Sequence, residues 1–373
     1  VLVVGGGVAG IQASLDLADS GIKVYLVDQG PSIGGVMAQL DKTFPTNDCS
    51  MCILSPKRVA TGRHPNITIL TNAEITGLSG EAGNFEVGLR RRSRYIIEEK
   101  CNGCGVCAQK CPIEVVDSFN EGLGQRGAIY VEYPQAVPLK YMIDREKCIG
   151  CGTCDEICKA HAIQYDQEDS EAKLKVGSII LAPGFESFDA RLKTEYGYGR
   201  FPNVVTSIEF ERILSASGPY GGLVLRPSDG EIPKKIAFIQ CVGSRDYQLG
   251  NNYCSAACCM YGMKEAVIAK EHTPSKLDAK IFFMDMRSYG KEFDAYYERA
   301  QGEWGIQFVR SRVAGVTEDP KTGNLLVHFV ENENPKTEEF DMVVLSVGMT
   351  PPKDAKKIAE RLGVKLDKYG FCD

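Results

Sequence analysis

Residues 101–112 read CNGCGVCAQKCP, and residues 148–158 read CIGCGTCDEIC. In each run two residues separate each of the first three cysteines from the next, and three residues separate the third cysteine from the fourth. One tight loop can direct only three thiolates at a four-iron cubane, so the fourth ligand has to come from the other run. The two runs therefore predict a ferredoxin-like module that holds two [4Fe–4S] clusters.

The spacing also predicts which cysteines share a cluster. The two expected ligand sets are Cys101, Cys104, Cys107 with Cys158, and Cys148, Cys151, Cys154 with Cys111. Zinc is the main alternative, but zinc sites favour separated cysteine pairs, and disulfides are a further alternative. Lys159 stands where the first run has Pro112, a difference that removes no ligand.

Length and composition set the broad class. A chain of 373 residues with 43% hydrophobic and 25% charged residues is long enough for two or three globular domains. The net charge of −6 gives no electrostatic support for nucleic-acid binding. The chain has 15 cysteines, and the ferredoxin spacing of eight of them indicates a reducing, cytoplasmic location. No apolar run approaches the ~20 residues that span a bilayer, and no signal peptide is visible. The chain opens on a strand without an initiator Met, so we expect a fragment of a longer protein.

The N-terminal residues predict a dinucleotide site. An apolar strand, Val1–Val4, leads into GGGVAG at residues 5–10, a helix follows, and a second strand ends at Asp28. In this fingerprint the first glycine allows a tight turn, the second admits the pyrophosphate and the third lets the helix pack on the strand, while the carboxylate accepts the ribose hydroxyls. The expected cofactor contacts here are Gly5, Gly7, Val8, Ala9, Gly10 and Asp28. A fortuitous glycine-rich turn is the alternative.

Three further N-terminal features stay open. Gly34 and Gly35 indicate a second backbone approach to the cofactor, or a plain loop. Cys49 and Cys52 could form a redox dithiol, half of a metal site or a pair of buried thiols, so their role is unassigned. The basic run at residues 90–94 is a solvated strand end or a docking patch for an acidic electron carrier.

After the cluster module the chain is expected to return to the first domain. Lys173–Leu181 reads as a strand that runs into Ala182, Pro183 and Gly184, the pattern with which two-domain flavoproteins re-enter the FAD domain. The fold class is therefore α/β, with a ferredoxin module at residues 95–168 inserted into an FAD-binding domain made of residues 1–94 and 169–233. Phe201–Gly230 reads as a linker.

A second nucleotide-type domain is expected at residues 234–346, with residues 347–373 starting a return to the FAD domain. Its first strand, Lys235–Gln240, leads into Cys241 instead of a glycine fingerprint. The cysteines near this strand end and the next helix are Cys241, Cys254, Cys258 and Cys259. They predict a third [4Fe–4S] cluster, or a set of small buried thiols. Lys264 is either a cation near the flavin or an exposed helical lysine, and Gly348 is a further candidate for cofactor contact.

Taken together, the cysteines at 241–259, the stretch Pro45–Lys57 and the inserted ferredoxin resemble the iron–sulfur A subunit (HdrA) of heterodisulfide reductase. The resemblance covers essentially the whole chain. It implies a thioredoxin-reductase-like core with two dinucleotide-binding domains, FAD and several cubanes, in a multi-subunit complex. It implies that Cys241, Cys254, Cys258 and Cys259 are cluster ligands and that Lys264 approaches flavin N5.

The family resemblance also implies electron bifurcation and partners. The expected partners are the other subunits, an electron donor such as a hydrogenase or formate dehydrogenase, and ferredoxin as the low-potential acceptor. Family members continue into a last FAD-contacting segment and a second ferredoxin domain that this chain does not contain. The alternatives are a stand-alone NAD(P)H-dependent flavoprotein resembling the glutamate synthase small subunit, and an electron-wiring module without flavin.

Overall fold

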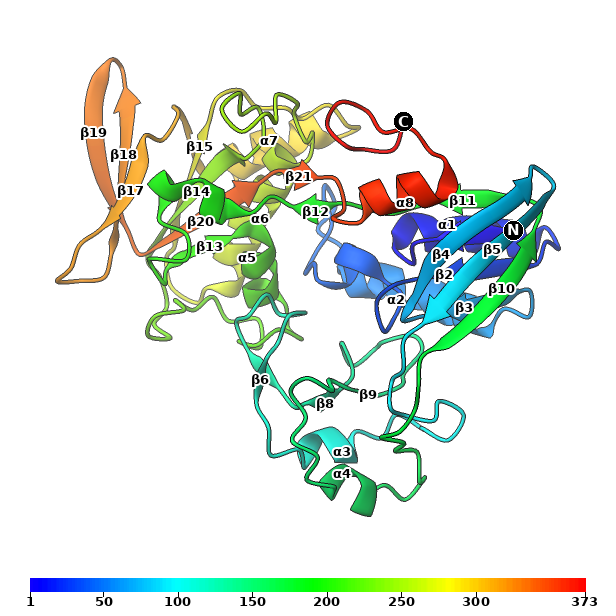
Figure 1. The fold of residues 1–373 in the computed structure, drawn as a ribbon. Helices are drawn as coiled ribbons and strands as arrows, with labels where there is room; N and C mark the ends of the chain where they lie inside the picture. The colour runs from blue at the N-terminus through cyan, green and yellow to red at the C-terminus, as the bar shows by residue number, and fades with distance from the viewer. The chain divides into compact units, whose positions relative to one another are not determined.

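The computed structural model covers residues 1–373 and divides into two compact units. The first unit contains residues 1–38, 51–184 and 351–373, and the second contains residues 39–50 and 185–350. Figure 1 shows the elements of both units. No helix in the structure combines the length and the apolar character needed to cross a membrane.

A four-stranded parallel sheet forms the centre of the first unit. Its order is β11-β1-β2-β3, with β1 at Leu2–Val4, β2 at Val24–Val27, β3 at Ile67–Leu70 and β11 at Ile179–Leu181. Helix α1 (Val8–Asp19) connects the first two strands and packs on β1, β2 and β3, and α2 (Ser50–Arg63) precedes β3. Parallel neighbours joined by a helical crossover are the defining unit of a dinucleotide-binding fold.

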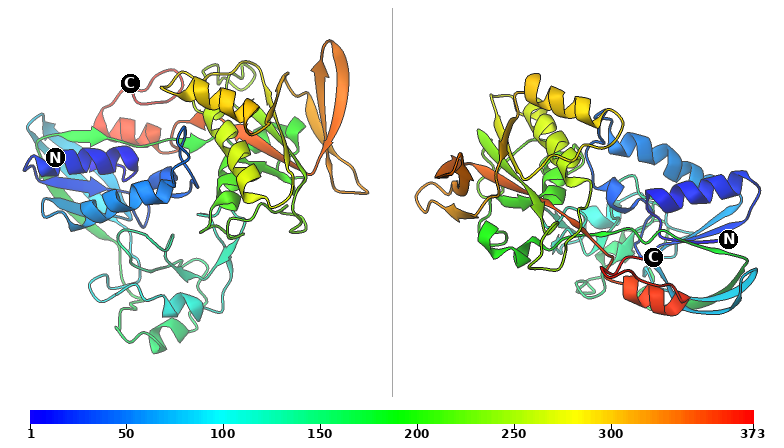
Figure 2. Two further views of the ribbon diagram at one scale, coloured as in Figure 1. Left: turned by 180° about the vertical axis from the view of Figure 1, so that it is seen from behind. Right: turned by 90° about the horizontal axis from the view of Figure 1, so that it is seen from above.

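A three-stranded antiparallel sheet completes this part. It pairs β10 (Ser170–Val176) with β5 (Asn84–Arg91) and β4 (Ala73–Glu81). The prediction of one strand over Lys173–Leu181 was wrong, because Gly177 and Ser178 separate β10 from β11 and the two strands join different sheets. Helix α8 (Ala355–Leu362) packs on β4, and Figure 2 shows α1 and α8 on opposite sides of these strands.

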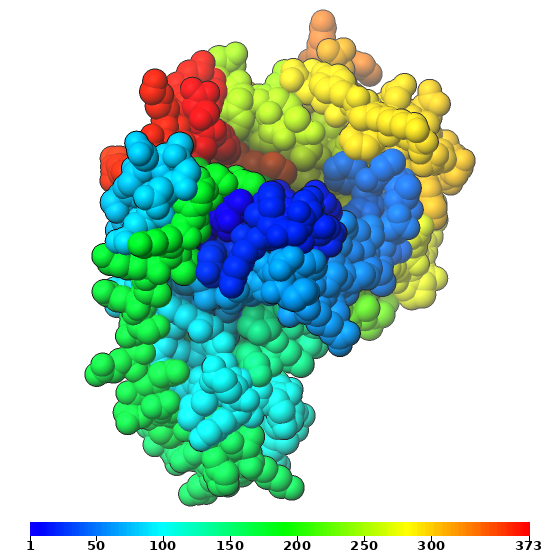
Figure 3. All heavy atoms as spheres, turned by 90° about the vertical axis from the view of Figure 1, so that its right-hand side faces the viewer, coloured from blue at the N-terminus to red at the C-terminus, as the bar shows by residue number.

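The cluster module is inserted between β5 and β10 and consists of short elements. Its two helices are α3 (Val106–Gln109) and α4 (Thr153–Glu156), which contact each other. Two small hairpins pair β6 (Val115–Val116) with β7 (Gln125–Arg126) and β8 (Ile129–Tyr130) with β9 (Met142–Ile143). In the space-filling view of Figure 3 the module forms a lobe in cyan and green. So few regular elements leave only a small apolar core, as expected for a module that metal ligation stabilises.

The second unit is built on a five-stranded parallel sheet of order β13-β20-β14-β15-β16. The strand bounds are Val204–Thr206, Met342–Val347, Lys235–Val242, Asp278–Phe283 and Gln307–Arg310, in sheet order. The helices are α5 (Ser207–Leu214), α6 (Cys258–His272) and α7 (Phe293–Gly302), and α6 contacts β14, β15, β20 and α5. Its smaller sheets are β17-β18-β19 (Gly315–Glu318, Leu325–Glu331 and Asn334–Phe340) and β12-β21 (Glu186–Ser187 and Met349–Thr350). Short 3₁₀ turns lie at Gly35–Ala38 in the first unit and at Ala190–Leu192 and Thr194–Tyr196 in the second.

The predicted end of the FAD-binding part at residue 233 was wrong, because residues 185–233 belong to the second unit. The predicted linker Phe201–Gly230 contains β13 and α5, whose residues are almost all buried. A capping box starts this helix: the Thr206 side chain accepts from the Glu209 N–H, and the Glu209 side chain accepts from the Thr206 N–H. The T-x-x-E signal for a helix start was therefore present in the sequence.

Candidate functional site

The glycine turn after β1 has the geometry that a dinucleotide needs. Gly5 has a φ of +103°, and a Cβ there would lie 2.0 Å from the Ala182 carbonyl oxygen. A Cβ on Gly10 would lie 1.8 Å from the Gly5 carbonyl oxygen, whereas no atom lies within 4 Å of a Cβ built on Gly7. Gly5 and Gly10 are therefore fixed by close backbone packing, and Gly7 borders open space, as a pyrophosphate contact requires.

The N-terminus of α1 opens directly behind this turn. Gly7 is its N-cap residue, and no side chain caps the helix. The free N–H groups of a first helical turn, together with the helix dipole, form a ready anion site. Val8 is 47% exposed, so it lies open beside the turn with Ala9.

Asp28 stands at the end of β2 and fixes the same turn. Its Oδ2 accepts a hydrogen bond from the Gly6 N–H at 2.6 Å, and its Oδ1 accepts one from the Gly30 N–H at 2.7 Å. Burial raises the pKa of the Asp28 carboxyl, and the two backbone donors oppose this shift. The carboxylate thus lies next to the glycine turn, where ribose hydroxyls would reach it.

Gly34 and Gly35 also reach the glycine turn. The Gly34 N–H donates to the Gly6 carbonyl oxygen at 2.8 Å, and a Cβ on Gly35 would lie 2.9 Å from the Gly7 Cα. Both residues have positive φ, at +145° and +58°. The structure therefore places this pair against the fingerprint, and the pairing of β1 with β11 places Ala182 and the following Pro183 and Gly184 on its other side.

Arg58 is a candidate that the sequence analysis missed. It is fully buried on α2, stacks over the Tyr133 ring at 4.9 Å and lies 3.6 Å from a Cβ built on Gly34. Its Nη2 donates to Ser55 Oγ at 2.9 Å, but its Nε and Nη1 have no partner. A buried guanidinium with free donors calls for an anionic acceptor. No short motif marks such a residue.

The cluster module repeats one backbone pattern twice. Gly103 and Gly105 have φ values of +74° and +82°, and the equivalent Gly150 and Gly152 have values of +71° and +80°. Each pair of left-handed glycines turns the loop so that a helix starts one residue before the third cysteine of its run. The two runs are therefore structural repeats of each other as well as sequence repeats.

The cysteines of the two runs gather in a common apolar core. One cavity is lined by Cys111, Cys148, Cys151 and Cys154. Cys101 and Cys104 lie close enough to Cys107 to help raise its pKa, which burial brings to about 12. Cys158 belongs to the same core. Burial disfavours a free thiolate at Cys107, and binding of a metal ionises such a thiol.

No three side chains of the metal-binding types converge closely enough to hold a single ion. The ligands of a cubane surround four iron atoms, so this finding concerns single-ion sites such as zinc. Tyr165 adds a hydrogen-bonding group, since its Oη lies 3.0 Å from Cys154 Sγ. A hydrogen bond to a ligand sulfur tunes the potential of a cluster.

In the second unit the four thiols meet at the end of β14. Cys241 lies near the end of this strand with a φ of +62°, and Cys258 and Cys259 open α6. Cys241, Cys254 and Cys259 all lie close enough to Cys258 to help raise its pKa, which burial brings to about 12. The second unit thus brings together all four cysteines of the predicted third set.

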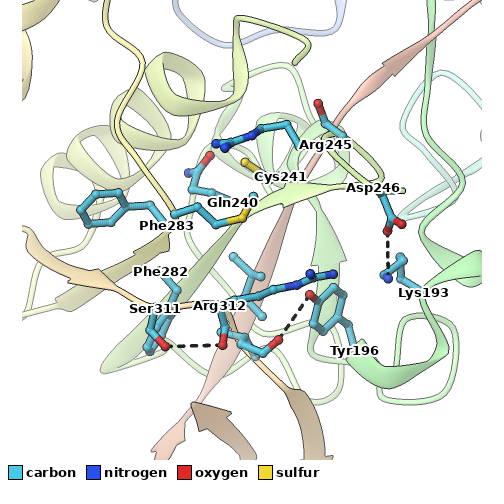
Figure 4. Close-up of a pocket in the computed structure, with 14 residues that line it drawn as sticks. Lys193, Tyr196, Gln240, Cys241, Arg245, Asp246, Phe282, Phe283, Ser311 and Arg312 are labelled. Atoms are coloured by element: carbon cyan, nitrogen blue, oxygen red, sulfur yellow. Dashed lines mark hydrogen bonds and ion pairs between the residues drawn. The ribbon is translucent and has the colours of Figure 1, made fainter. Parts of the chain in front are cut away.

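Two arginines lie beside these thiols. Arg245 forms an ion pair with Asp285 Oδ1, and Arg287 Nε lies 3.3 Å from Asp285 Oδ2. Their positive charges oppose the burial that raises the pKa of Cys241 and Cys259. Figure 4 shows Cys241 and Arg245 at a pocket whose cavity volume is about 20 Å³. A cavity of that size holds about one water molecule.

Lys264 lies about one and a half turns beyond Cys258 and Cys259 on α6 and is not the exposed helical lysine of the alternative interpretation. Only 1% of the residue is exposed, and its ammonium forms an ion pair with Glu211 of α5. Gly348 follows β20, and a Cβ there would lie 2.9 Å from the Ser244 Cβ. Lys264 and Gly348 both belong to the second unit. Of the unassigned cysteines, Cys49 belongs to the second unit, and Cys52 and Cys372 belong to the first.

The basic run at residues 90–94 is neutralised by acidic neighbours. Arg90 pairs with Asp169 at 2.7 Å, and Arg91 and Arg94 pair with Glu98 at 2.6 and 2.7 Å. These pairs tie three of the four arginines to neighbouring carboxylates, so the structure favours the strand-end interpretation.

Three family models match separate parts of the chain. Residues 1–54 match an FAD dependent oxidoreductase, residues 100–163 a 4Fe-4S dicluster domain and residues 266–373 a pyridine nucleotide-disulphide oxidoreductase. The fold resembles thioredoxin reductases from T. acidophilum and Lactococcus lactis, each with a TM-score of 0.52 and 13% identity, over 100% of this chain and 83% of theirs. The chain is thus an iron–sulfur flavoprotein that binds FAD and two [4Fe–4S] clusters on a thioredoxin-reductase-like fold with an inserted dicluster domain.

Curated relatives show which proteins the chain resembles along its whole length. The chain is 52% identical over 99% of its length to the iron-sulfur A subunit of the CoB--CoM heterodisulfide reductase of Methanocaldococcus jannaschii, and 54% identical to the second such A subunit of Methanopyrus kandleri. It is 50% identical to the A subunit of the H(2):CoB-CoM heterodisulfide,ferredoxin reductase of Methanothermobacter marburgensis. The chain is therefore similar to these heterodisulfide reductase A subunits over almost its whole length. It covers 56%, 57% and 56% of these three proteins, so it spans about half their length.

Proposed function

We propose that this chain relays electrons between FAD and [4Fe–4S] clusters as part of the A subunit of a heterodisulfide-reductase-like complex. The observation that carries the proposal is the meeting of Cys241, Cys254, Cys258 and Cys259 at the end of β14. In a pyridine-nucleotide domain this strand end carries the glycine turn for a pyrophosphate. Here four thiols replace that turn, so the domain would hold a third cubane in place of a nucleotide that donates hydride.

The proposed ligands of the third cluster fit the chemistry of the site. Cys258 and Cys259 start α6, whose N-terminal dipole stabilises thiolates and the negative charge of a cluster. The charges of Arg245 and Arg287 act in the same direction. The alternative of small buried thiols does not account for two cations held beside them by one carboxylate.

In the dicluster domain we assign Cys148, Cys151, Cys154 and Cys111 to one cluster, an assignment supported by their shared cavity. Cys101, Cys104, Cys107 and Cys158 are assigned to the other cluster. The exchange of the fourth ligand between the runs follows from the repeat geometry of the two loops.

For FAD the proposed contacts are the fingerprint Gly5, Gly7, Val8, Ala9 and Gly10, with Asp28 at the ribose. Gly34 and Gly35 and the residues Ala182, Pro183 and Gly184 complete the set, and their packing on the turn supports this assignment. Gly348 stays a candidate. Bound FAD accepts two electrons, whereas each cluster carries one.

Lys264 is proposed as the residue of the second unit that serves the flavin. Its ammonium is buried, and Glu211 holds it in one position, so it can present a fixed positive charge and a hydrogen-bond donor. A cation beside the flavin stabilises its reduced, anionic form.

The complete protein is proposed to work in the cytoplasm, within an assembly that takes electrons from a hydrogenase or formate dehydrogenase. Relatives are named as H(2)- or H(2)/formate-dependent heterodisulfide,ferredoxin reductases. Those names pair a disulfide with ferredoxin as acceptors. They support electron bifurcation, in which the reduced flavin sends one of its two electrons to ferredoxin and the other to the disulfide.

Anaerobic titration of the purified protein with NADH and NADPH tests this proposal against the NAD(P)H-dependent alternative. The small cavity and the missing glycine turn predict that neither nucleotide reduces the flavin. Dithionite is the control and should bleach the same flavin. Rapid bleaching by NADH or NADPH would contradict the proposal, and a protein with its iron but no FAD would favour the wiring module.

A further inference from the structure

A group of carboxyls surrounds the buried ammonium of Lys264. The Glu211 carboxylate is the centre of the group: one of its oxygens pairs with Lys264, and the other accepts the Asp41 backbone N–H at 2.9 Å. Glu265 follows Lys264 on α6 and also faces Glu211. Lys264, Glu211 and Glu265 are each at most 1% exposed. One cation is therefore buried against two buried acidic side chains, with the Asp41 carboxyl nearby.

The neighbouring cations are directed elsewhere. Lys42 points to Glu271, with an Nζ–Oε2 distance of 3.5 Å, and Arg212 Nη1 donates to the Gln39 carbonyl oxygen at 2.8 Å. His272 lies close enough to Asp41 to lower the pKa of its carboxyl, and the buried Nδ1 of His272 has no hydrogen-bond partner. Tyr261 lies near Glu265 but donates to the Val347 carbonyl oxygen.

Glu265 in particular has no donor to accept from. Both of its carboxyl oxygens are buried without a partner, which is untenable for a carboxylate but not for a carboxylic acid. As an acid, Glu265 can donate its O–H to the Glu211 carboxylate, and such sharing is the usual arrangement of two adjacent carboxyls. Burial and the charge of Glu211 both raise the pKa of Glu265 well above its ordinary value.

We propose that Glu265 is a neutral carboxylic acid that holds a reserve proton for Lys264 and delivers it through Glu211. When Lys264 gives its ammonium proton to the reduced flavin, the O–H bond of Glu265 breaks and an O–H bond forms on Glu211. That proton then moves from Glu211 to the Lys264 amine, which restores the ammonium and leaves a carboxylate at Glu265. On reoxidation the proton returns along the same path and Glu265 becomes an acid again, so charge and atoms balance. This inference rests on the proposed service of Lys264 to the flavin.

Infrared spectroscopy of the cofactor-loaded full chain at neutral pH tests the proposal. A protonated carboxylic acid has a carbonyl stretch that shifts in heavy water, and we expect the Glu265 band to vanish in Glu265→Gln. The matched control is Glu271→Gln on the same helix, where Glu271 pairs with Lys42 near the surface and the band should persist. Because Gln keeps the size of Glu and provides a donor toward Glu211, Glu265→Gln should fold and retain its iron and flavin.

Reduced-minus-oxidised difference spectra then test delivery. The band should lose intensity when the flavin is reduced and recover on reoxidation. Absence of the band at neutral pH, its persistence in Glu265→Gln, or a constant band through the reduction would each overturn the inference. Failure of the proposed function is distinguishable: it would show as missing flavin or missing iron of the third cluster, which the same samples report by cofactor analysis.

Discussion

Lys264 and Glu211, 53 positions apart in the chain, form an ion pair in which each side chain is 2% exposed. The pair joins α6 to α5 inside the second unit. Removing two charges from water costs more than an ordinary surface pair returns, so such a pair is weak evidence for a role in stability. We propose a use in electron transfer instead, because Lys264 lies about one and a half helical turns after Cys258 and Cys259 on α6.

Breaking this pair should be strongly destabilising. Lys264→Met leaves the Glu211 carboxylate buried without its cation, and we expect a loss of about 3–5 kcal/mol in the free energy of unfolding. The double variant Lys264→Met with Glu211→Leu should recover most of that loss. The control Lys42→Met removes a more exposed pair and should cost less than about 1 kcal/mol. Denaturant unfolding measures all three, and a single variant as stable as the wild type would contradict the burial argument.

The hydrogen bond between Tyr165 and Cys154 should set the potential of one cluster. Loss of a hydrogen bond to a ligand sulfur makes reduction harder, so Tyr165→Phe should shift one midpoint potential by roughly 20–60 mV to more negative values. Tyr141→Phe is the matched control, because Tyr141 lies near Cys107 in the other run. A redox titration monitored by EPR measures the midpoint potentials of both variants. An unchanged potential in Tyr165→Phe would show that this hydroxyl does not donate to the sulfur.

Glu132 should make the first unit lose stability as the pH rises. Its carboxyl accepts from Ser32, but burial raises its pKa from 4.5 to about 7. A carboxyl with a raised folded-state pKa contributes its full stability below pH 4.5 and loses it as the pH passes 7. Between pH 4.5 and pH 8 the free energy of unfolding of Glu132→Gln should therefore rise relative to that of the wild type by up to about 3 kcal/mol. The rise should be smaller if solvent reaches the carboxyl. Unfolding curves at several pH values would contradict this if the difference did not change with pH.

Asp28 should decide the affinity for FAD. Asp28→Asn keeps the size of the side chain but removes the charge that would accept the ribose hydroxyls, so FAD should bind about 10–100-fold more weakly. The control Asp19→Asn changes an exposed residue at the end of α1 and should leave the affinity unchanged. Fluorescence titration with FAD measures the constants. Iron content should stay the same in both variants, and equal FAD affinities would argue against a ribose contact.

Local patterns predicted the parts of the molecule that local physics determines. The strand before Gly5, the helix after it and the strand that ends at Asp28 all lie where the glycine fingerprint and the apolar periodicity put them. The four cysteines of the third set meet because a strand end and the following helix start lie side by side in this fold. These features need few residues and short separations along the chain.

Other features depended on contacts between distant segments. Lys173–Leu181 reads as one strand, but β10 and β11 pair with partners far away in the chain and divide between two sheets. Glu211 lies in a stretch whose Pro and Gly content resembles a linker, and only its pairing with Lys264 gives it a role. Arg58 likewise becomes notable only because the fold buries it without partners for two of its nitrogens. No single-sequence pattern encodes such pairings.

Iron, sulfide and flavin analysis of the anaerobically purified chain, combined with EPR, tests the central claim most directly. For protein that includes the remaining part of the FAD site, we predict one FAD and about 12 iron and 12 sulfide atoms, that is, three cubanes. Cys258→Ser should remove about four of each and one EPR signal. About eight iron atoms in the wild type, unchanged in Cys258→Ser, would contradict a third cluster in the second unit.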